Sequence, residues 1–179
     1  MAVREIIRMG HPTLRQVAEP FPESEIGGET FINLVNDLKD TLKATGNGIG
    51  LAAPQINVSY RVAIIDIPSP ETRYGTVTPL PCTVYVNPVI TILNDHREGY
   101  WEGCLSVPDM KGYVERPQHI KVEYLNERGE PEAVELEGFL ATVFQHEFDH
   151  LDGVLYVDRL KDTRMFAFDA EFANYHFET

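Results

Sequence analysis

The sequence predicts an α+β fold, in which antiparallel or mixed β-sheets surround a central α-helix, with one further helix toward each end of the chain. Two observations lead to this prediction. Three stretches repeat apolar residues at helical spacing, and much of the remaining chain consists of segments rich in β-branched and aromatic residues. With 179 residues, 43% of them hydrophobic, the chain can bury a sizeable core. We therefore expect one domain over residues 1–179, with residues 160–179 as a C-terminal helical extension.

Helical periodicity places the three helices at residues 30–45, 139–152 and 162–175. The first presents an apolar face and ends at Gly46, which suits a helix C-cap. The third repeats apolar residues at helical spacing, and we expect this stripe to pack on the body of the protein. Its members are Met165, Phe168, Phe172 and Tyr175.

Four segments predict β-strands, at residues 60–67, 83–93, 120–125 and 133–136. Apolar and polar residues alternate most clearly in the third, as in a strand with one buried face. Residues 126–129, Asn-Glu-Arg-Gly, are typical of a turn and would join the last two strands. Two prolines and a glycine mark residues 68–75 as an exposed loop rather than a linker between domains.

The second helix carries the segment His146-Glu-Phe-Asp-His150. Two imidazoles four residues apart share one helix face, a spacing found in metal-dependent hydrolases. Glu147 falls within the apolar arc, where a carboxylate would carry a heavy desolvation cost without a partner. A water on a metal ion beside the histidines is the simplest partner, and the carboxylate could accept its proton. The alternative is a helix with surface or capping histidines. On the opposite face we expect solvent to reach Thr142, Gln145, Asp149 and Asp152.

The third metal ligand is open at this point, because a catalytic site of this kind usually has three protein ligands. Glu171, on the predicted C-terminal helix, lies at a roughly suitable separation for the glutamate ligand of thermolysin-like endopeptidases. Cys104 lies upstream, in a segment whose glycine and proline indicate a shaped loop or a strand end. A small buried core residue is the other interpretation of Cys104. Tyr156 stands where the metzincin pattern requires a histidine, so that pattern lacks its ligand.

Residues 46–55, Gly-Asn-Gly-Ile-Gly-Leu-Ala-Ala-Pro-Gln, form a glycine-dense loop. Glycines let the backbone approach a ligand closely, and the Gln55 amide could stabilise a developing oxyanion. Phosphate-binding loops follow a strand and open a helix, whereas this loop follows a helix and has no Lys-Ser/Thr pair behind it, which disfavours a nucleotide site. A tight turn leading into a strand remains the structural alternative.

Three motifs together resemble the peptide deformylase family, since Gly48–Gln55, Glu102–Ser106 and Gln145–His150 occur in the order of that family. One such motif alone is weak to moderate support, but three in order are highly specific. The resemblance covers most of the chain and is thinnest at residues 68–81 and after Lys161. It implies an enzyme that hydrolyses the formyl group from the N-terminal formylmethionine of newly synthesised polypeptides and releases formate.

The resemblance also implies a metal centre. Cys104, His146 and His150 would hold one divalent cation, natively Fe²⁺, which Ni²⁺, Co²⁺ or Zn²⁺ can replace. Glu147 would take a proton from the attacking water and later deliver one to the leaving amine. A thiolate with two neutral imidazoles leaves the site a net charge of about +1, which can still lower the pKa of a bound water.

The remaining roles follow from the same resemblance. The Gln55 side chain and the backbone N–H of Leu105 would face the oxyanion. Ile49 and Gly50 would hydrogen-bond the substrate backbone as a neighbouring strand does. Val143 would line the apolar pocket for the methionine side chain.

Two features of the chain depart from the family pattern, namely one residue and the C-terminal end. Many members carry arginine at the position of Lys111, where it can pair with Glu102; lysine loses the bidentate fork, so we expect a slightly looser site. Bacterial members can carry a basic C-terminal extension that helps docking near the ribosomal tunnel exit. The end of this chain is acidic, which favours packing over transient ribosome contact.

Charge and cysteine content bound the partners. A net charge of −13 argues against nucleic-acid binding, and no apolar run approaches transmembrane length. We expect a monomer in the cytoplasm that acts on N-formylmethionyl nascent peptides, with Cys82 a bystander kept reduced. The other histidines lack spacing partners and are expected to be structural or surface residues, namely His11, His96, His119 and His176.

Overall fold

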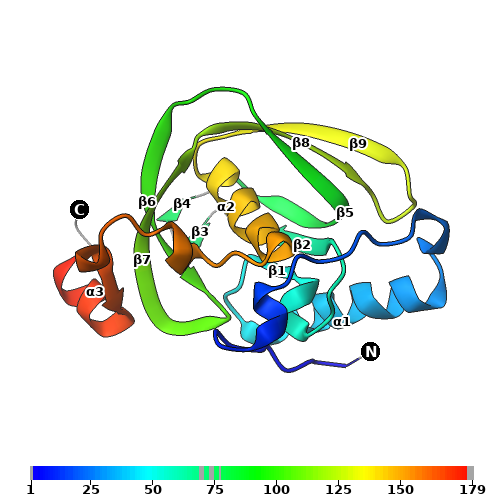
Figure 1. Cartoon of the computed structure of the whole chain (residues 1–179), viewed down its shortest axis with the longest axis horizontal. Helices are drawn as coiled ribbons and strands as arrows, with labels where there is room; N and C mark the ends of the chain where they lie inside the picture. The colour runs from blue at the N-terminus through cyan, green and yellow to red at the C-terminus, as the bar shows by residue number, and fades with distance from the viewer. Residues whose placement is uncertain (1, 69–70, 73–74, 77, 177–179) are drawn as a thin grey trace.

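The computed structural model describes residues 2–68, 71–72, 75–76 and 78–176 and has an α+β architecture (Figure 1). A five-stranded antiparallel sheet contains, in spatial order, β1 (Gly50–Ala52), β2 (Val62–Ile67), β5 (Leu80–Ile92), β8 (His119–Leu125) and β9 (Pro131–Glu137). A three-stranded antiparallel sheet contains β10 (Phe166–Phe168), β7 (Val107–Pro117) and β6 (Arg97–Cys104). The helices are α1 (Glu29–Thr45), α2 (Gly138–Asp149) and α3 (Asp169–Tyr175).

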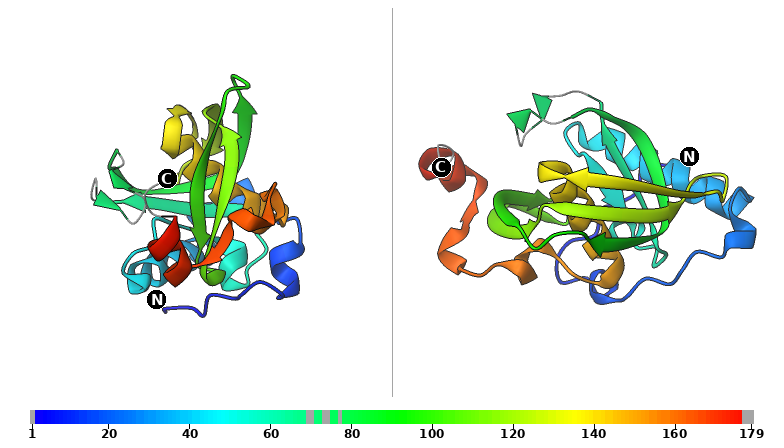
Figure 2. Two further views of the ribbon diagram at one scale, coloured as in Figure 1. Left: turned by 90° about the vertical axis from the view of Figure 1, so that its left-hand side faces the viewer. Right: turned by 90° about the horizontal axis from the view of Figure 1, so that it is seen from above.

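Helix α2 lies at the centre, between the two sheets, as expected (Figures 1 and 2). Strand β2 is apolar on both faces, so each of its faces can pack against a helix. Val62 and Ile64 join the cluster formed with α1, whereas Ala63, Ile65 and Ile67 join the cluster formed with α2. The large sheet therefore carries α1 on one face and α2 on the other.

Most sequence-predicted elements are present within the described residues. The first helix and the four strands appear with small changes at their ends, and β8 pairs with β9 across the predicted turn. The second helix ends at Asp149 and continues as a single 3₁₀ turn, His150–Asp152. In and just after the predicted loop, β3 (Glu71–Thr72) pairs with β4 (Gly75–Thr76). We also predicted that the loop is exposed, but the residues that would test this lie largely outside the described part of the chain.

The predicted solvent-facing side of α2 is wrong for all but Asp152. Thr142, Gln145 and Asp149 are buried, because strand β7 of the small sheet lies against that face of the helix. Their polar groups are paired inside the protein. Gln145, for example, donates from Nε2 to the carbonyl of Pro117 at 2.8 Å. The helix is thus enclosed on both sides, although its sequence is amphipathic.

The C-terminal region differs most from the prediction. The expected helix over residues 162–175 is instead a 3₁₀ turn (Thr163–Met165), strand β10 and the short helix α3. The predicted apolar stripe is wrong at two of its four positions, since Phe168 is 61% and Tyr175 76% exposed, whereas Phe172 packs on Trp101 as expected. Strand β10 forms because the edge of β7 offers unpaired backbone groups, and this pairing overrides the local helical pattern.

Smaller expectations agree with the structure. Cys82 is exposed, Cys104 is buried, and both are free thiols. Among the described residues, no helix combines the length and apolar character needed to cross a membrane. The other histidines make structural or surface contacts: His11 caps a 3₁₀ turn, His96 and His119 pair with glutamates, and His176 packs on Trp101.

Candidate active site

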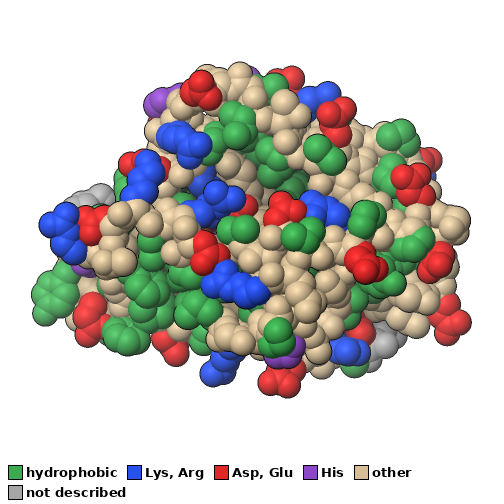
Figure 3. Space-filling model, in the orientation of Figure 1, with side chains coloured by type: hydrophobic (Ala, Val, Ile, Leu, Met, Phe, Trp, Pro, Cys, Tyr) green, Lys and Arg blue, Asp and Glu red, His purple; other side chains and the backbone are tan. Residues whose placement is uncertain are grey.

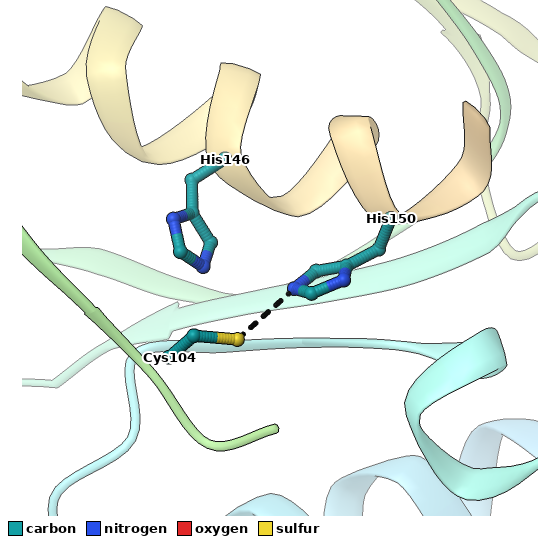
Figure 4. Close-up of side chains that lie close together, drawn as sticks. All are labelled: Cys104, His146 and His150. Carbon is teal, nitrogen blue, oxygen red and sulfur yellow. Dashed lines mark hydrogen bonds between the residues drawn. The ribbon is translucent and has the colours of Figure 1, made fainter. Parts of the chain in front are cut away.

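The side chains of the three expected metal ligands point toward one another (Figure 4). Cys104 ends β6, His146 lies in the last turn of α2, and His150 begins the 3₁₀ turn that continues α2. One ligand atom from each residue lies within 4.8 Å of the other two, and Sγ of Cys104 is 3.3 Å from Nε2 of His150. One sulfur with two imidazole nitrogens is a donor set that suits a divalent metal ion with a fourth position open.

The electrostatics of the cluster favour metal binding. Burial raises the pKa of the Cys104 thiol, but the two neighbouring histidines outweigh burial and hold that pKa well below its ordinary value. The thiolate is the form in which cysteine binds metals. The residues present therefore fit a divalent cation in both geometry and charge.

Glu102 orients His146. The Nδ1 of His146 lies 2.8 Å from Oε2 of Glu102, so an N–H at Nδ1 donates to the carboxylate and leaves Nε2 as the metal-binding nitrogen. Arg116 holds Glu102 in turn through two hydrogen bonds, of 2.6 and 2.9 Å. Burial raises the pKa of the Glu102 carboxyl, but the hydrogen bonds and charge of Arg116 outweigh it and lower that pKa to about 2. Glu102 is thus ionised beside the histidine.

The expected pairing of Lys111 with Glu102 is wrong, because Arg116 occupies that role. Glu102 pairs with Gly112 across the β6–β7 ladder. Side chains alternate along a strand, so Lys111 faces away from Glu102, whereas Arg116, four residues after Gly112, lies on the same face. The bidentate fork is therefore present, and the looser site expected from Lys111 has no basis. Had β7 been recognised as a strand, the alternation of its side chains would have indicated Arg116 as the partner of Glu102.

The ion-pair network continues from Arg116 to the surface. Arg116 also donates from Nη1 to Asp149 at 2.7 Å, and Arg159 makes two hydrogen bonds of 2.5 Å to the same carboxylate. Arg116 is 2% and Glu102 4% exposed, so this network replaces water around buried charges. It ties the end of α2 to the small sheet.

A pocket opens beside the metal cluster. Every predicted site residue except His150 lines it, and Phe139, Glu102, Gly103 and Thr142 complete the lining. The sequence had not assigned Phe139 to the site, although it lies one turn before Val143 on the same helix. The pocket thus joins an apolar wall to the polar groups around the metal ligands.

Glu147 and Gly50 are in close contact within this pocket. Glu147 is 6% exposed, which confirms its predicted burial. A Cβ at Gly50 would lie 2.5 Å from both Cδ and Oε1 of Glu147. Glycine at this position is therefore a steric requirement for the observed position of the carboxylate.

The methyl group added by Gly50→Ala would displace the Glu147 carboxylate. We expect turnover to fall by about 10²-fold with the fold intact, because a displacement of about 1 Å of a catalytic group can cost that much. Steady-state kinetics would measure it. In a Glu147→Ala background the same substitution should cost little more, since the side chain it collides with is gone. Equal losses in both backgrounds would contradict this explanation.

Gln55 is fixed with its amide nitrogen toward the cluster. Its Oε1 accepts a hydrogen bond from the backbone N–H of Ala52 at 2.9 Å. Its Nε2 lies 3.2 Å from Oγ of Ser106 and 3.7 Å from Sγ of Cys104. Leu105 lies next to this group, in the turn between β6 and β7. The amide nitrogen of Gln55 is therefore held in place before any ligand binds.

Strand β1 is an edge strand of the large sheet, and the pocket lies beside it. The N–H of Asp66 donates to the carbonyl of Ile49 at 2.9 Å. Because hydrogen-bonded pairs alternate along an antiparallel ladder, the N–H and C=O of Gly50 point away from β2. An extended peptide could pair with Gly50, whereas the carbonyl of Ile49 is already engaged.

The alternative third ligand, Glu171, is not part of the cluster. It is exposed on α3, and Cys104 supplies the third donor atom instead. Tyr156 is buried with its ring stacked against His146, at 6.0 Å between centroids. Tyr156 therefore supports a ligand without being one.

Comparison with known proteins agrees with this geometry. A sequence model of the family described as polypeptide deformylase matches residues 3–165. The chain belongs to the peptide deformylase family. It is accordingly an enzyme of protein biosynthesis that removes the N-terminal formyl group from nascent polypeptides.

Individual members of the deformylase family match nearly the whole chain. The peptide deformylase of Leptospira biflexa is 44% identical over 171 residues, covering 96% of this chain and 95% of that protein. Peptide deformylase 1 of Prochlorococcus marinus is 47% identical over 171 residues, covering 96% and 88%. The Met-Ala-Ser-bound crystal structure of a class I type b deformylase from Acinetobacter baumannii matches with a TM-score of 0.84 at 35% identity, covering 89% of this chain and 99% of that chain.

Proposed function

We propose that the chain hydrolyses the formamide bond of N-formylmethionyl polypeptides at a divalent cation held by Cys104, His146 and His150. One observation carries the proposal: the three donor atoms lie within 4.8 Å of one another beside a pocket that Glu147 and Gln55 also line. When bound, a divalent cation supplies Lewis acidity, which polarises a carbonyl and lowers the pKa of water.

The residues around the pocket divide the remaining chemistry. Glu147 accepts a proton from the attacking water and delivers one to the leaving amine, so the C–N bond breaks as formate is released. The Gln55 amide, held by Ala52, donates to the oxyanion together with the backbone N–H of Leu105. Because the Gln55 donor is positioned before the reaction, it needs little reorganisation as charge develops.

The pocket and the edge of β1 account for substrate binding. Val143 and Phe139 provide an apolar wall that suits a methionine side chain. The backbone of Gly50 pairs with the peptide main chain, which supplies affinity without reading sequence. The structure of the Acinetobacter baumannii relative contains bound Met-Ala-Ser, and we propose that this chain likewise binds a peptide that begins with methionine.

We propose Fe²⁺ as the native ion, with Ni²⁺, Co²⁺ or Zn²⁺ able to replace it. The imidazoles suit all four ions, and the thiolate favours the softer ones. We place the enzyme in the cytoplasm, because a reducing compartment keeps Cys104 and Cys82 as free thiols. We also propose that it acts as a monomer.

Formate release from formyl-Met-Ala-Ser tests the proposal. Protein loaded with Ni²⁺, or with Fe²⁺ without oxygen, should release formate, and the same protein stripped of metal should not. Acetyl-Met-Ala-Ser serves as the substrate control and should release no acetate at a comparable rate. No formate above the metal-free control would overturn the proposed function.

The third ligand has a separate test. We expect Cys104→Ser to lower bound Ni²⁺ well below one ion per chain, because a serine hydroxyl replaces the thiolate. Glu171→Ala should leave metal content unchanged, since Glu171 is exposed on α3. Metal analysis after dialysis measures both. The opposite pattern would favour a thermolysin-like ligand set.

A further inference from the structure

The last described residues lie beyond the part of the chain that the family model matches, which ends at residue 165. Strand β10 and helix α3 lie at one end of the molecule, beside β6 and β7 (Figures 1 and 2). Phe166 of β10 pairs with Gly112 of β7, and Gly112 pairs on its other side with Glu102. One strand therefore separates this C-terminal segment from the carboxylate that orients His146.

Helix α3 packs on the outer face of the strand that carries the metal site. Trp101 directly precedes Glu102, and consecutive side chains of a strand point to opposite faces. Glu102 contacts His146 on the inner face. On the outer face, the Trp101 ring lies 5.0 Å from the ring of Phe172 and 4.9 Å from that of His176, between centroids.

Lys111 provides a second attachment for α3. Its Nζ lies 3.8 Å from the carboxylate of Asp169 and 5.9 Å from the centre of the Phe172 ring. Its side chain is only 14% exposed, whereas Glu171, Ala173 and most other residues of α3 are exposed. A helix of seven residues is not stable alone, so α3 depends on its contacts with the small sheet, and these contacts are among them.

The surface around these elements is shown in the space-filling view, where apolar side chains gather over the end of the molecule that carries α3 (Figure 3). A two-stranded ribbon is marginally stable by itself, and β6–β7 gains its outer cover and third strand from this segment. Displacement of the backbone at Trp101 would also displace Glu102 and, two residues further, Cys104.

We propose that docking of α3 on Trp101 positions Glu102 and Cys104 for metal binding, which makes Phe172 a positioning residue of the metal centre. The inference rests on the metal ligands proposed above. Since binding free energies are reciprocal, metal binding must strengthen the docking of α3 to the same extent that docking strengthens metal binding.

The experiment compares Ni²⁺ affinity in three variants of the full chain, by competition with a chelator. Trp101 is the one tryptophan of the chain, so its fluorescence reports directly whether α3 is docked. Phe172→Ala should shift Trp101 emission to the red and weaken Ni²⁺ binding by about tenfold, as loss of outer-shell support typically does. Ala173→Pro, which breaks α3 at an exposed position, should have the same two effects.

Phe168→Ala is the matched control, because it removes a 61% exposed aromatic ring from the same segment and should change neither quantity. Far-ultraviolet circular dichroism at the assay temperature confirms that each variant is folded. Changed Trp101 emission with unchanged Ni²⁺ affinity would overturn the inference, as would unchanged emission in both variants. Either result would leave the proposed function intact, provided that the unsubstituted chain binds Ni²⁺ and releases formate.

Discussion

Glu147→Gln is expected to lower formate release by about 10²–10⁴-fold, the usual contribution of a general acid–base group. Glutamine keeps the size and shape of the buried side chain, but it cannot accept a proton. Glu147 is 6% exposed and lies against Gly50, so an isosteric replacement should leave the packing of the pocket nearly unchanged. The loss should therefore fall on kcat, with bound metal still at one ion per chain.

The matched control is Glu135→Gln, which makes the same chemical change on β9, where the side chain is 67% exposed. Its activity should equal that of the unsubstituted enzyme. Metal analysis of both variants separates a catalytic effect from loss of the ion. Activity of Glu147→Gln within a few-fold of the control would show that another group transfers the proton.

The parts of the site that could be predicted from sequence are those encoded by local spacing. His146, Glu147 and His150 needed only the 3.6-residue period of a helix, which also predicts that Glu147 is buried. Sequence spacing could not decide between Cys104 and Glu171 as the third ligand. Cys104 and the two histidines come from separate segments, and whether these segments lie close together depends on the register of the sheet. The family resemblance supplied that choice, and the structure places the three donor atoms together.

Strands β6 and β7 show why other elements escaped prediction. Both contain glycines, which normally indicate loops. Here the glycines serve close packing: a Cβ at Gly99 would collide with the ring of Tyr113, and one at Gly112 would lie 2.7 Å from a methyl carbon of Leu160. The need for glycine comes from residues far away in sequence. Because β7 was not foreseen, neither the partner of Glu102 nor the pairing of β10 could be derived.

Arg116→Met is expected to destabilise the metal-free protein by about 3–5 kcal/mol, the usual cost of removing one partner from a buried ion pair. Arg116 is 2% exposed and donates to both Glu102 and Asp149. Methionine fills similar volume but leaves Glu102 with only His146 as a hydrogen-bond partner among the contacts described above. Urea unfolding without metal measures the effect, because bound metal would add its own stabilisation.

Arg164→Met provides the matched control. Arg164 also pairs with an aspartate, Asp162, but its side chain is 88% exposed, so loss of this solvent-screened pair should leave the free energy of unfolding nearly unchanged. Arg116→Lys should fall between the two, because lysine restores the charge without the bidentate fork. If Arg116→Met were no less stable than Arg164→Met, the network from His146 to Asp149 would not be what holds α2 against the small sheet. The position of His146 would then have to depend on Tyr156 and the surrounding apolar packing instead.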